Sequence, residues 1–313
     1  MIYSISGTYK FDQSEPIMEK HSEIVELQGG LGNQLFGWVY ATYRASQIDS
    51  KVMIMSTKLN KRGFQLGQFG ISPGKPPFLL ELINQLSKKL PFRLVEKLLR
   101  EINVSIIDVL DFRKTVLEGN LQDISSKRVL HRGYFQELIY VNSEVRHQMN
   151  ELKNNFKGSD KYYETLENKI FKEFNAIHIR GGDYLKHNEV FLLPNKSYYE
   201  KCVKLLNNPT EIPLVVFTND HEYSLKLFPS ADLIVSENYG LTPADNLMIM
   251  SKSSGFIGAN STFSWWAAMF RDANLQAPFF PWPWLKNNLE SSRTLIPHDW
   301  NVVEINQSGN PID

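Results

Sequence analysis

Strand and helix signals alternate along residues 174–271, and this alternation restricts the fold of the 313-residue chain more than any other feature. Short apolar runs bounded by Gly, Pro or Asn alternate with amphipathic segments, which is the pattern of β-α-β units that build a parallel sheet. The pattern predicts strands at 174–180, 213–218, 232–235 and 255–258, and helices at 197–206, 222–227, 243–252 and 262–271.

The N-terminal half shows the same alternation. It predicts strands at 24–28, 51–56 and 128–132, helices from 33 onward and from 136 to 152, and an amphipathic stretch at 80–101. Residues 153–170 are charged and poor in apolar side chains, as in a linker or a solvated helix. We therefore expect an α/β protein with two Rossmann-like domains. The expected parts are a polar N-terminal extension at 1–22, an N-terminal domain at 23–155, a linker region at 156–173, a second domain at 174–295 and a C-terminal tail at 296–313.

Residues 176–184 read AIHIRGGDY, an apolar strand that ends in an arginine, two glycines and an acid. The period of two puts His178 and Arg180 on one face of the strand. Arg180 then stands at the carboxyl end of a strand, where open α/β sheets bind ligands, and its planar guanidinium suits a phosphate. The glycines would let the backbone turn closely past that ligand. The structural alternative is an edge-strand Arg180 paired with Asp183.

Residues 255–270 read GFIGANSTFSWWAAMF, a short strand followed by a break and an amphipathic run. Asn260, Ser261 and Thr262 are all favourable N-cap residues before the expected helix. Free backbone N–H groups and two hydroxyls at a helix start can bind an anion. The alternative is an ordinary capped helix, with its two adjacent tryptophans in the core.

A third segment, IVELQGGLGNQLFGWVY at 24–40, predicts a strand, a glycine turn that includes Gly30 and Gly32, and a helix from Asn33. The spacing fits neither the G-x-G-x-x-G dinucleotide motif nor a phosphate-binding loop that ends in Lys-Ser or Lys-Thr. By itself this segment indicates no particular ligand.

Composition excludes several classes. Lys plus Arg and Asp plus Glu balance at 34 each, so no net field favours nucleic acid. The single Cys202 excludes an internal disulfide and is consistent with a reducing compartment. We find no apolar run of the ~18–20 residues that a membrane span requires, and the polar N-terminus does not resemble a signal peptide. The basic amphipathic stretch at 83–100 predicts a surface helix, with peripheral contact to an anionic membrane as the alternative.

Together the three segments resemble the alpha-1,2-fucosyltransferase family, inverting enzymes that use GDP-L-fucose. That family typically opens with a strand and GGLGNQ-F, then carries an H-x-R-R-G-D-Y segment and later an ANSTFSWW segment. Further matches in the same order are GYFQ at 133–136, VFTND at 216–220, DNLM at 245–248 and IPHDW at 296–300. The resemblance covers residues 24–302 and is closest to the unanchored bacterial type.

The resemblance implies a GT-B fold, in which an acceptor-side domain and a GDP-fucose-binding domain face a cleft. It also implies fucosyl transfer with inversion from GDP-β-L-fucose to a hydroxyl, here expected to be O2 of a terminal galactose. The expected acceptor is a β-galactoside-containing oligosaccharide or a lipid-linked glycan. We expect no cofactor, no metal and no nucleic-acid partner, and a cytoplasmic location, with the inner face of the membrane as an alternative.

The resemblance also suggests roles for single residues. Arg180, with Ser261 and Thr262, would hold the donor diphosphate, and Asp245 would accept hydrogen bonds from guanine. His178 would line the nucleoside or order the turn, with a buried structural role as the alternative. The glycine turn adds Gly30, Gly32 and Asn33 to the expected donor contacts.

The general base is open among three possibilities: Asp183, Glu26, or a leaving phosphate oxygen acting without a side-chain base. The chain departs from the family at Gly181, where a second Arg is common, and this removes one positive charge near the expected site. An Asn219-Asp220 pair stands where many nucleotide-sugar enzymes have a D-x-D metal motif.

Two other classes remain possible. One is another GDP-sugar transferase, such as an alpha-1,6- or protein O-fucosyltransferase. The other is a non-catalytic sugar-nucleotide or glycan-binding protein.

Overall fold

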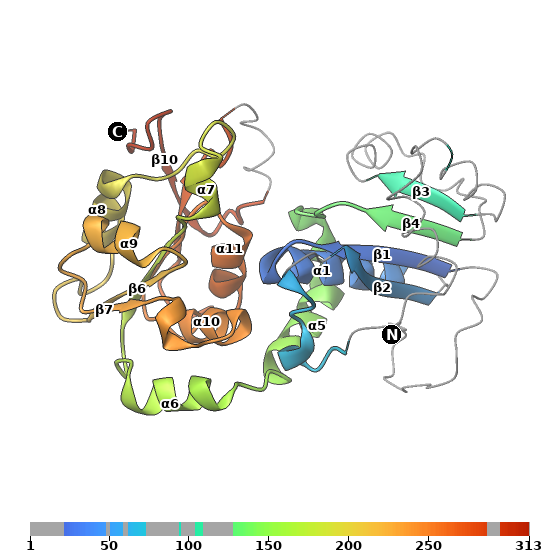
Figure 1. The fold of residues 1–313 in the computed structure, drawn as a ribbon, viewed down its shortest axis with the longest axis horizontal. Helices are drawn as coiled ribbons and strands as arrows, with labels where there is room; N and C mark the ends of the chain where they lie inside the picture. The colour runs from blue at the N-terminus through green and yellow to red at the C-terminus, as the bar shows by residue number, and fades with distance from the viewer. Residues whose placement is uncertain are drawn as a thin grey trace. The chain divides into compact units, whose positions relative to one another are not determined.

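The chain forms two compact units, Met1–Phe156 and Lys157–Asp313 (Figure 1). The structure is a computed structural model, and it describes residues 22–47, 51–58, 62–72, 94, 104–108, 128–286 and 295–312. The extension at 1–21 and nearly all of the amphipathic stretch at 80–101 lie outside these residues.

The first unit contains a four-stranded parallel sheet in the order β2-β1-β4-β3. Its elements are β1 (Ser22–Gln28), α1 (Leu31–Gln47), β2 (Lys51–Lys58), η2 (Gly67–Phe69), β3 (Val104–Asp108), β4 (Arg128–Arg132), η4 (Leu138–Tyr140) and α5 (Ser143–Asn154). Helix α1 packs against β1, and its Leu35, Phe36 and Val39 are fully buried. Strands β1 and β4 are parallel neighbours, so the segments that follow them start at the same edge of the sheet.

A buried polar network at the start of β1 ties this sheet to α1. Arg44 donates from Nε and Nη2 to the two carboxylate oxygens of Glu23, at 2.8 and 2.6 Å. His131 on β4 donates from Nε2 to the same carboxylate at 2.9 Å, and its Nδ1 lies 3.0 Å from the Tyr40 hydroxyl. Burial raises the pKa of Glu23, but the hydrogen bonds from Arg44 and His131 outweigh it and lower that pKa to about 2.

The second unit contains a six-stranded parallel sheet in the order β10-β9-β8-β5-β6-β7. Its strands are β5 (Asn175–Ile179), β6 (Leu214–Thr218), β7 (Leu233–Val235), β8 (Phe256–Ile257), β9 (Phe279–Trp282) and β10 (Asn301–Glu304). Its helices are α6 (Asp160–Asn168), α7 (Asp183–Lys186), α8 (Lys196–Lys204), α9 (His221–Leu227), η5 (Glu237–Tyr239), α10 (Pro243–Met250) and α11 (Thr262–Met269).

Read from β7 to β10, this strand order is that of a Rossmann sheet, with the switch point between β5 and β8. All five residues of β5 are buried, as expected for a central strand covered on both faces. The predicted α/β class with two Rossmann-like units, the feature shared by GT-B proteins, is therefore confirmed.

Every strand and helix expected between 174 and 271 forms, with ends that differ by no more than two residues. The helix expected from 136 to 152 begins only at Ser143, because Phe135 has a positive φ of 54° and Glu137 is extended. Residues 160–168, in the expected linker region, form α6, which lies beside α10 (Figure 1).

The segment expected as a C-terminal tail at 296–313 instead supplies β10, which pairs in parallel with β9. Strand β10 has only four residues, Asn-Val-Val-Glu, and one of them is buried, so the sequence gives no clear periodic signal there. The sheet therefore continues beyond the expected domain end at 295.

Candidate functional site

The two segments singled out in the second unit meet at the carboxyl edge of its sheet. Arg180 follows β5, and Ser261 follows β8 through Gly258, Ala259 and Asn260. Strands β5 and β8 are parallel neighbours, with Ala176 opposite Phe256 and Ile177 opposite Ile257. The gap between them is the switch point of the sheet, where ligands bind in open α/β proteins.

The guanidinium of Arg180 is held over an aromatic ring. Its Cζ lies 4.9 Å from the centroid of Tyr184 in α7. Tyr184 in turn stacks on Phe191, with centroids 4.0 Å apart and an interplanar angle of 7°. This contact is a cation–π interaction, in which the positive charge is attracted to the electron-rich face of the ring. The half-buried Arg180 thus contacts the ring of Tyr184, while the side chain of Asp183 lies outside the described part of the structure.

The glycine turn after Arg180 packs on the loop between β6 and α9. The Gly181 N–H donates to Asn219 Oδ1 at 3.0 Å, and the Gly182 N–H donates to Asp220 Oδ2 at 3.1 Å. Gly182 has φ 59° and ψ −110°, a conformation that glycine adopts far more readily than other residues. The amides of both glycines are thus directed to this loop, and the close approach of a ligand to the turn stays a prediction.

His178 lies inside the sheet, two residues before Arg180, and only 3% of it is exposed. Its Nδ1 is hydrogen-bonded to the Ser264 hydroxyl of α11, which also accepts the Ala259 N–H at 3.2 Å. Burial, assisted by the charge of Arg180, lowers the pKa of His178 to about 3, so the ring is neutral at pH 7.

The Ser264 hydroxyl is hydrogen-bonded both to the His178 ring and to the Ala259 N–H. A hydroxyl has one proton and two acceptor positions, so the direction of its hydrogen bond with Nδ1 depends on the tautomer of the ring. The hydrogen bond between Ser264 and His178 thus connects α11 to β5.

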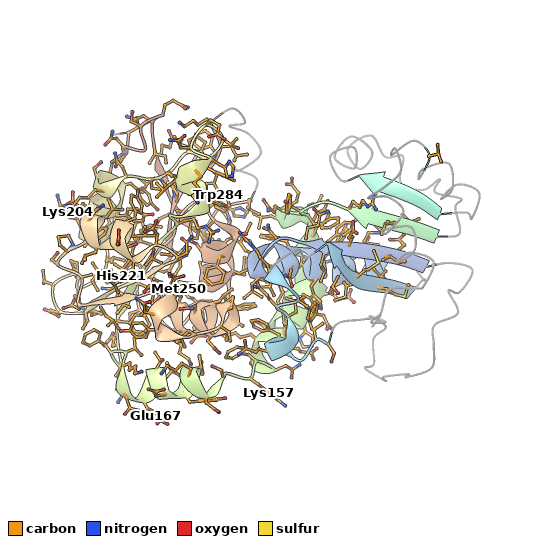
Figure 2. All side chains as sticks on the ribbon, in the orientation of Figure 1. Lys157, Glu167, Lys204, His221, Met250 and Trp284 are labelled. Carbon is orange, nitrogen blue, oxygen red and sulfur yellow. The ribbon has the colours of Figure 1, made fainter. Side chains whose placement is uncertain are left out.

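Helix α11 begins at the expected position, with Ser261 as its N-cap. The Ser261 hydroxyl accepts the Phe263 N–H at 3.3 Å, and Ser261 itself is buried. Asn260, which the sequence offered as a possible N-cap, precedes the N-cap. Its side-chain amide donates to the carbonyls of Leu192 and Trp284 at 2.9 and 3.2 Å. It therefore ties neighbouring loops together beside the helix start (Figure 2 labels Trp284).

Asp245 is fully buried and acts as a cap. Its Oδ1 accepts the Ser159 N–H at 3.1 Å, and its Oδ2 accepts the Ser159 hydroxyl at 2.7 Å and the Thr242 N–H at 3.0 Å. Burial raises its pKa, but the hydrogen bonds from Ser159 and Thr242 outweigh this and hold the pKa below its usual value. These contacts fix the start of α6 to α10, and the guanine contact of Asp245 stays a prediction.

The structure describes the side chain of only one of the two acids considered as general bases, Glu26. Asp183 is the first residue of α7, and its side chain lies outside the described part. Glu26 is 1% exposed in β1 of the first unit, and its Oε2 accepts the Arg132 Nε–H at 3.0 Å. A buried carboxylate bound to an arginine favours a structural role for Glu26.

In the first unit, the glycine turn lies at the carboxyl end of β1. Gln34 holds it by donating to the carbonyls of Gly29 and Gly63, both at 3.0 Å, and by accepting the Gln65 N–H at 2.9 Å. Asn33 accepts a hydrogen bond from Gln136 of the loop after β4 at 3.1 Å, which links the segments that follow the neighbouring strands β1 and β4.

The two glycines expected to contact the donor, Gly30 and Gly32, have different surroundings. Gly30 has Arg62 close by, since a Cβ there would lie 2.9 Å from its Nη1. Gly32 is buried within the first turn of α1.

The sequence did not identify Ser264 or Gln34 as residues that hold the site segments. It also did not show that Asn219 and Asp220 hold the glycine turn after Arg180. A polar residue in the first turn of α11 and an acid just before α9 are visible in the sequence, but their partners lie far away in the chain. Only the strand order brings these partners together.

Within the described ranges, no three His, Cys, Asp or Glu residues are close enough to hold a metal ion together. Among the helices that the structure describes, none has the length and hydropathy of a membrane span.

The chain is similar to glycosyltransferases of known sequence. The chain is 25% identical over 304 residues to the O-antigen biosynthesis glycosyltransferase WbnK of Escherichia coli, covering 86% of this chain and 97% of that protein. It is 29% identical over 137 residues to an alpha-1,2-colitosyltransferase of Escherichia coli, covering 41% and 47%. A solved structure of NodZ alpha-1,6-fucosyltransferase, co-crystallized with GDP, matches 81% of this chain and 93% of its own, with TM-score 0.48 and 12% identity.

The family model described as Glycosyl transferase family 11 matches residues 23–275, which is most of the chain. The chain therefore belongs to glycosyl transferase family 11, the alpha-1,2-fucosyltransferase family that its motifs resemble.

Proposed function

We propose that this glycosyltransferase moves L-fucose from GDP-β-L-fucose to O2 of a terminal galactose on a glycan acceptor, with inversion and without a metal. The acceptor class is a β-galactoside-containing oligosaccharide or lipid-linked glycan. The similarity to an O-antigen biosynthesis glycosyltransferase supports a glycan of a bacterial polysaccharide as the acceptor.

One observation carries the donor part of this proposal. Arg180 and the N-terminus of α11 lie at the ends of two adjacent strands at the switch point of the second sheet. A guanidinium and a helix N-terminus both favour a diphosphate.

The reaction exchanges one C–O bond for another. The bond from the fucose anomeric carbon to the β-phosphate oxygen breaks with its electrons on oxygen, and the acceptor oxygen bonds to the same carbon from the opposite face. Negative charge therefore grows on the leaving GDP. Arg180 and the start of α11 at Ser261 and Thr262 stabilise this growing charge. His178 is neutral between pH 5 and 8, because burial and the charge of Arg180 lower its pKa to about 3, so Arg180 is the charged group of this strand end.

The acceptor hydroxyl must lose its proton as the new bond forms. Asp183 is the side-chain candidate that remains, because Glu26 is buried against Arg132. A phosphate oxygen of the leaving GDP is the other acceptor for this proton. We leave Asp245 out of the donor site, because its carboxylate accepts three hydrogen bonds from Ser159 and Thr242.

A second sugar-nucleotide donor should be tested beside GDP-fucose. The similarity to an alpha-1,2-colitosyltransferase favours a colitosyl donor as the alternative to fucosyl. Colitose is fucose without its 3-hydroxyl, so the same diphosphate site would serve both donors. The two reactions differ only in the contacts to the sugar ring.

The experiment supplies GDP-fucose or GDP-colitose with a panel of β-galactosides in the presence of EDTA. We expect GDP release, a product heavier by one fucosyl group, and an α-1,2 linkage by NMR. Loss of turnover with EDTA that manganese or magnesium restores would contradict the metal-free part. Transfer of colitose alone would replace the donor assignment, and binding of GDP-fucose without any transfer would favour a non-catalytic protein.

A further inference from the structure

We propose that Asp220, assisted by Asn219, is a positioning residue that sets the orientation of Arg180. This inference rests on the proposed function, because it assigns a supporting residue to the same donor site. Asp220 lies at the carboxyl end of β6, the strand next to β5, and just before His221, which opens α9 (Figure 2).

Each carboxylate oxygen of Asp220 has a separate partner. Oδ1 accepts the Tyr223 N–H at 3.1 Å and so caps α9. Oδ2 accepts the Gly182 N–H at 3.1 Å and so holds the turn that follows Arg180. Asn219 completes the clamp, since its Oδ1 accepts the Gly181 N–H at 3.0 Å and its Nδ2 donates to the Gly181 carbonyl at 3.4 Å.

The turn and the clamp are also in steric contact. A Cβ built on Gly181 would lie 2.7 Å from Asp220 Cβ, an atom that cannot move without the backbone. A Cβ on Gly182 would lie 2.7 Å from Asn219 Nδ2. Glycine at 181 is therefore explained by the space that Asp220 fills, and not by a positive φ, which Gly181 does not have.

Hydrogen bonds with the Thr218 hydroxyl hold the backbone of Asp220 in place. Its N–H donates to the Thr218 hydroxyl at 2.9 Å, that hydroxyl donates to the Asp220 carbonyl at 3.1 Å, and the Ser224 hydroxyl donates to Thr218 at 2.7 Å. Ser224 is fully buried in α9. The clamp therefore stands on the end of a sheet strand and a helix, which are rigid supports for a site.

The position of the turn reaches Arg180 through α7. The Gly181 carbonyl accepts the Tyr184 N–H at 3.2 Å, which sets the first turn of this short helix. Tyr184 carries the ring over which the Arg180 guanidinium lies. A shift of the turn would thus move both the backbone of Arg180 and the ring beneath its side chain.

The Asp220→Asn variant separates this role from simple helix capping. Asparagine is as good an N-cap as aspartate, so its one oxygen can still accept the Tyr223 N–H. Its NH₂ group would then face the Gly182 N–H, donor against donor, and release the turn. We expect kcat with GDP-fucose to fall about tenfold or more, on the scale of a misplaced catalytic group. The donor KM should change less than threefold, and the unfolding midpoint should stay at the wild-type value.

Asp232→Asn is the matched control. Asp232 also gives one carboxylate oxygen to a backbone amide, that of Leu214 at 2.8 Å, at the opposite end of the same strand β6. This variant should keep the wild-type kcat. An Asp220→Asn enzyme that behaves like Asp232→Asn would overturn the proposal.

A double-mutant cycle identifies the residue through which Asp220 acts. In an Arg180→Ala background, Asp220→Asn should cost less than twofold further in kcat, because the group that it positions is gone. Multiplication of the two single losses would show that Asp220 acts elsewhere, and would overturn the inference while leaving fucosyl transfer intact. A wild-type enzyme that transfers neither fucose nor colitose would instead refute the proposed function.

Discussion

The two units use buried charge in different ways. In the first unit, Glu23 and Arg44 pair with each other inside the protein, at the end of the sheet away from the glycine turn. In the second unit, the buried Asp245 and Arg271 bind backbone or hydroxyl groups instead, Arg271 through the carbonyls of residues 253, 254 and 276. Arg180 is half-buried after β5, with its guanidinium carbon 4.9 Å from the centroid of the Tyr184 ring.

The difference indicates which charges serve stability and which serve function. A charge held by an opposite charge is fixed, and its removal leaves the partner uncompensated. A guanidinium held by a ring face keeps its orientation through packing and can direct its N–H groups to a ligand. Substitutions in the first group should therefore act on folding, and substitutions of Arg180 on catalysis.

The largest expected effect on folding comes from Glu23→Gln. The amide cannot balance Arg44, so we expect a loss of about 3–5 kcal/mol in the free energy of unfolding, measured in urea. The donor KM of the enzyme that remains folded should be unchanged. Glu164→Gln is the matched control, because the pKa of Glu164 is also lowered to about 2, but by the exposed lysines Lys161 and Lys169. Solvent screens that pair, so its unfolding midpoint should not move.

Asp245→Ala should give a smaller loss of stability. It removes the acceptor for Ser159 and Thr242, and a buried hydrogen bond left without its partner costs about 1–3 kcal/mol. The donor KM should stay at the wild-type value when measured below the unfolding temperature. A raised donor KM with unchanged stability would restore the guanine contact that the family resemblance suggests for Asp245.

An effect on the same scale is the dependence of stability on mildly acidic pH. The pKa of His178 is lowered by burial and by Arg180 from 6.5 to about 3, so below pH 6.5 only the unfolded chain takes up its proton. Stability should therefore fall by about 1.4 kcal/mol per pH unit between pH 6 and 4. Urea unfolding of His178→Gln should show a flatter slope over that range. Equal slopes in the two proteins would show that His178 is protonated when folded.

Glu23 adds a second decrease at lower pH, with the same sign. Its pKa is lowered from about 4.3 in unfolded chains to about 2 when folded, so its contribution is present above pH 4.3 and is lost as the pH falls toward 2. The two groups can thus be separated by pH. Urea unfolding of Glu23→Gln should lose only the decrease below pH 4.3.

The sequence predicts the second unit well because its strands are short, apolar and bounded by turn residues. It predicts the first unit less well where tertiary packing decides, as at Phe135. That residue takes a positive φ while its ring stacks on Tyr40 at 4.2 Å, and the helix expected from 136 is delayed. Local propensity carries no signal for such a contact.

The candidate site shows the same limit. The sequence identifies Arg180, His178 and Ser261 because each lies at the end of an apolar run or the start of a helix. It could not show that the glycine amides face Asn219 and Asp220, nor that Asp245 is fixed to Ser159, since these partners lie 38 and 86 residues away in the chain.

The kcat of Arg180→Ala with GDP-fucose tests the central claim most directly. If Arg180 stabilises the charge that grows on the leaving diphosphate, kcat should fall by roughly 10²-fold or more, and by more than the donor KM rises. Arg180→Lys should recover little, because an ammonium cannot reproduce the planar fork of donors. The unfolding midpoint of both variants should remain near that of the wild type. A near-normal kcat in Arg180→Ala would contradict the assignment of the donor site to the switch point of the second sheet.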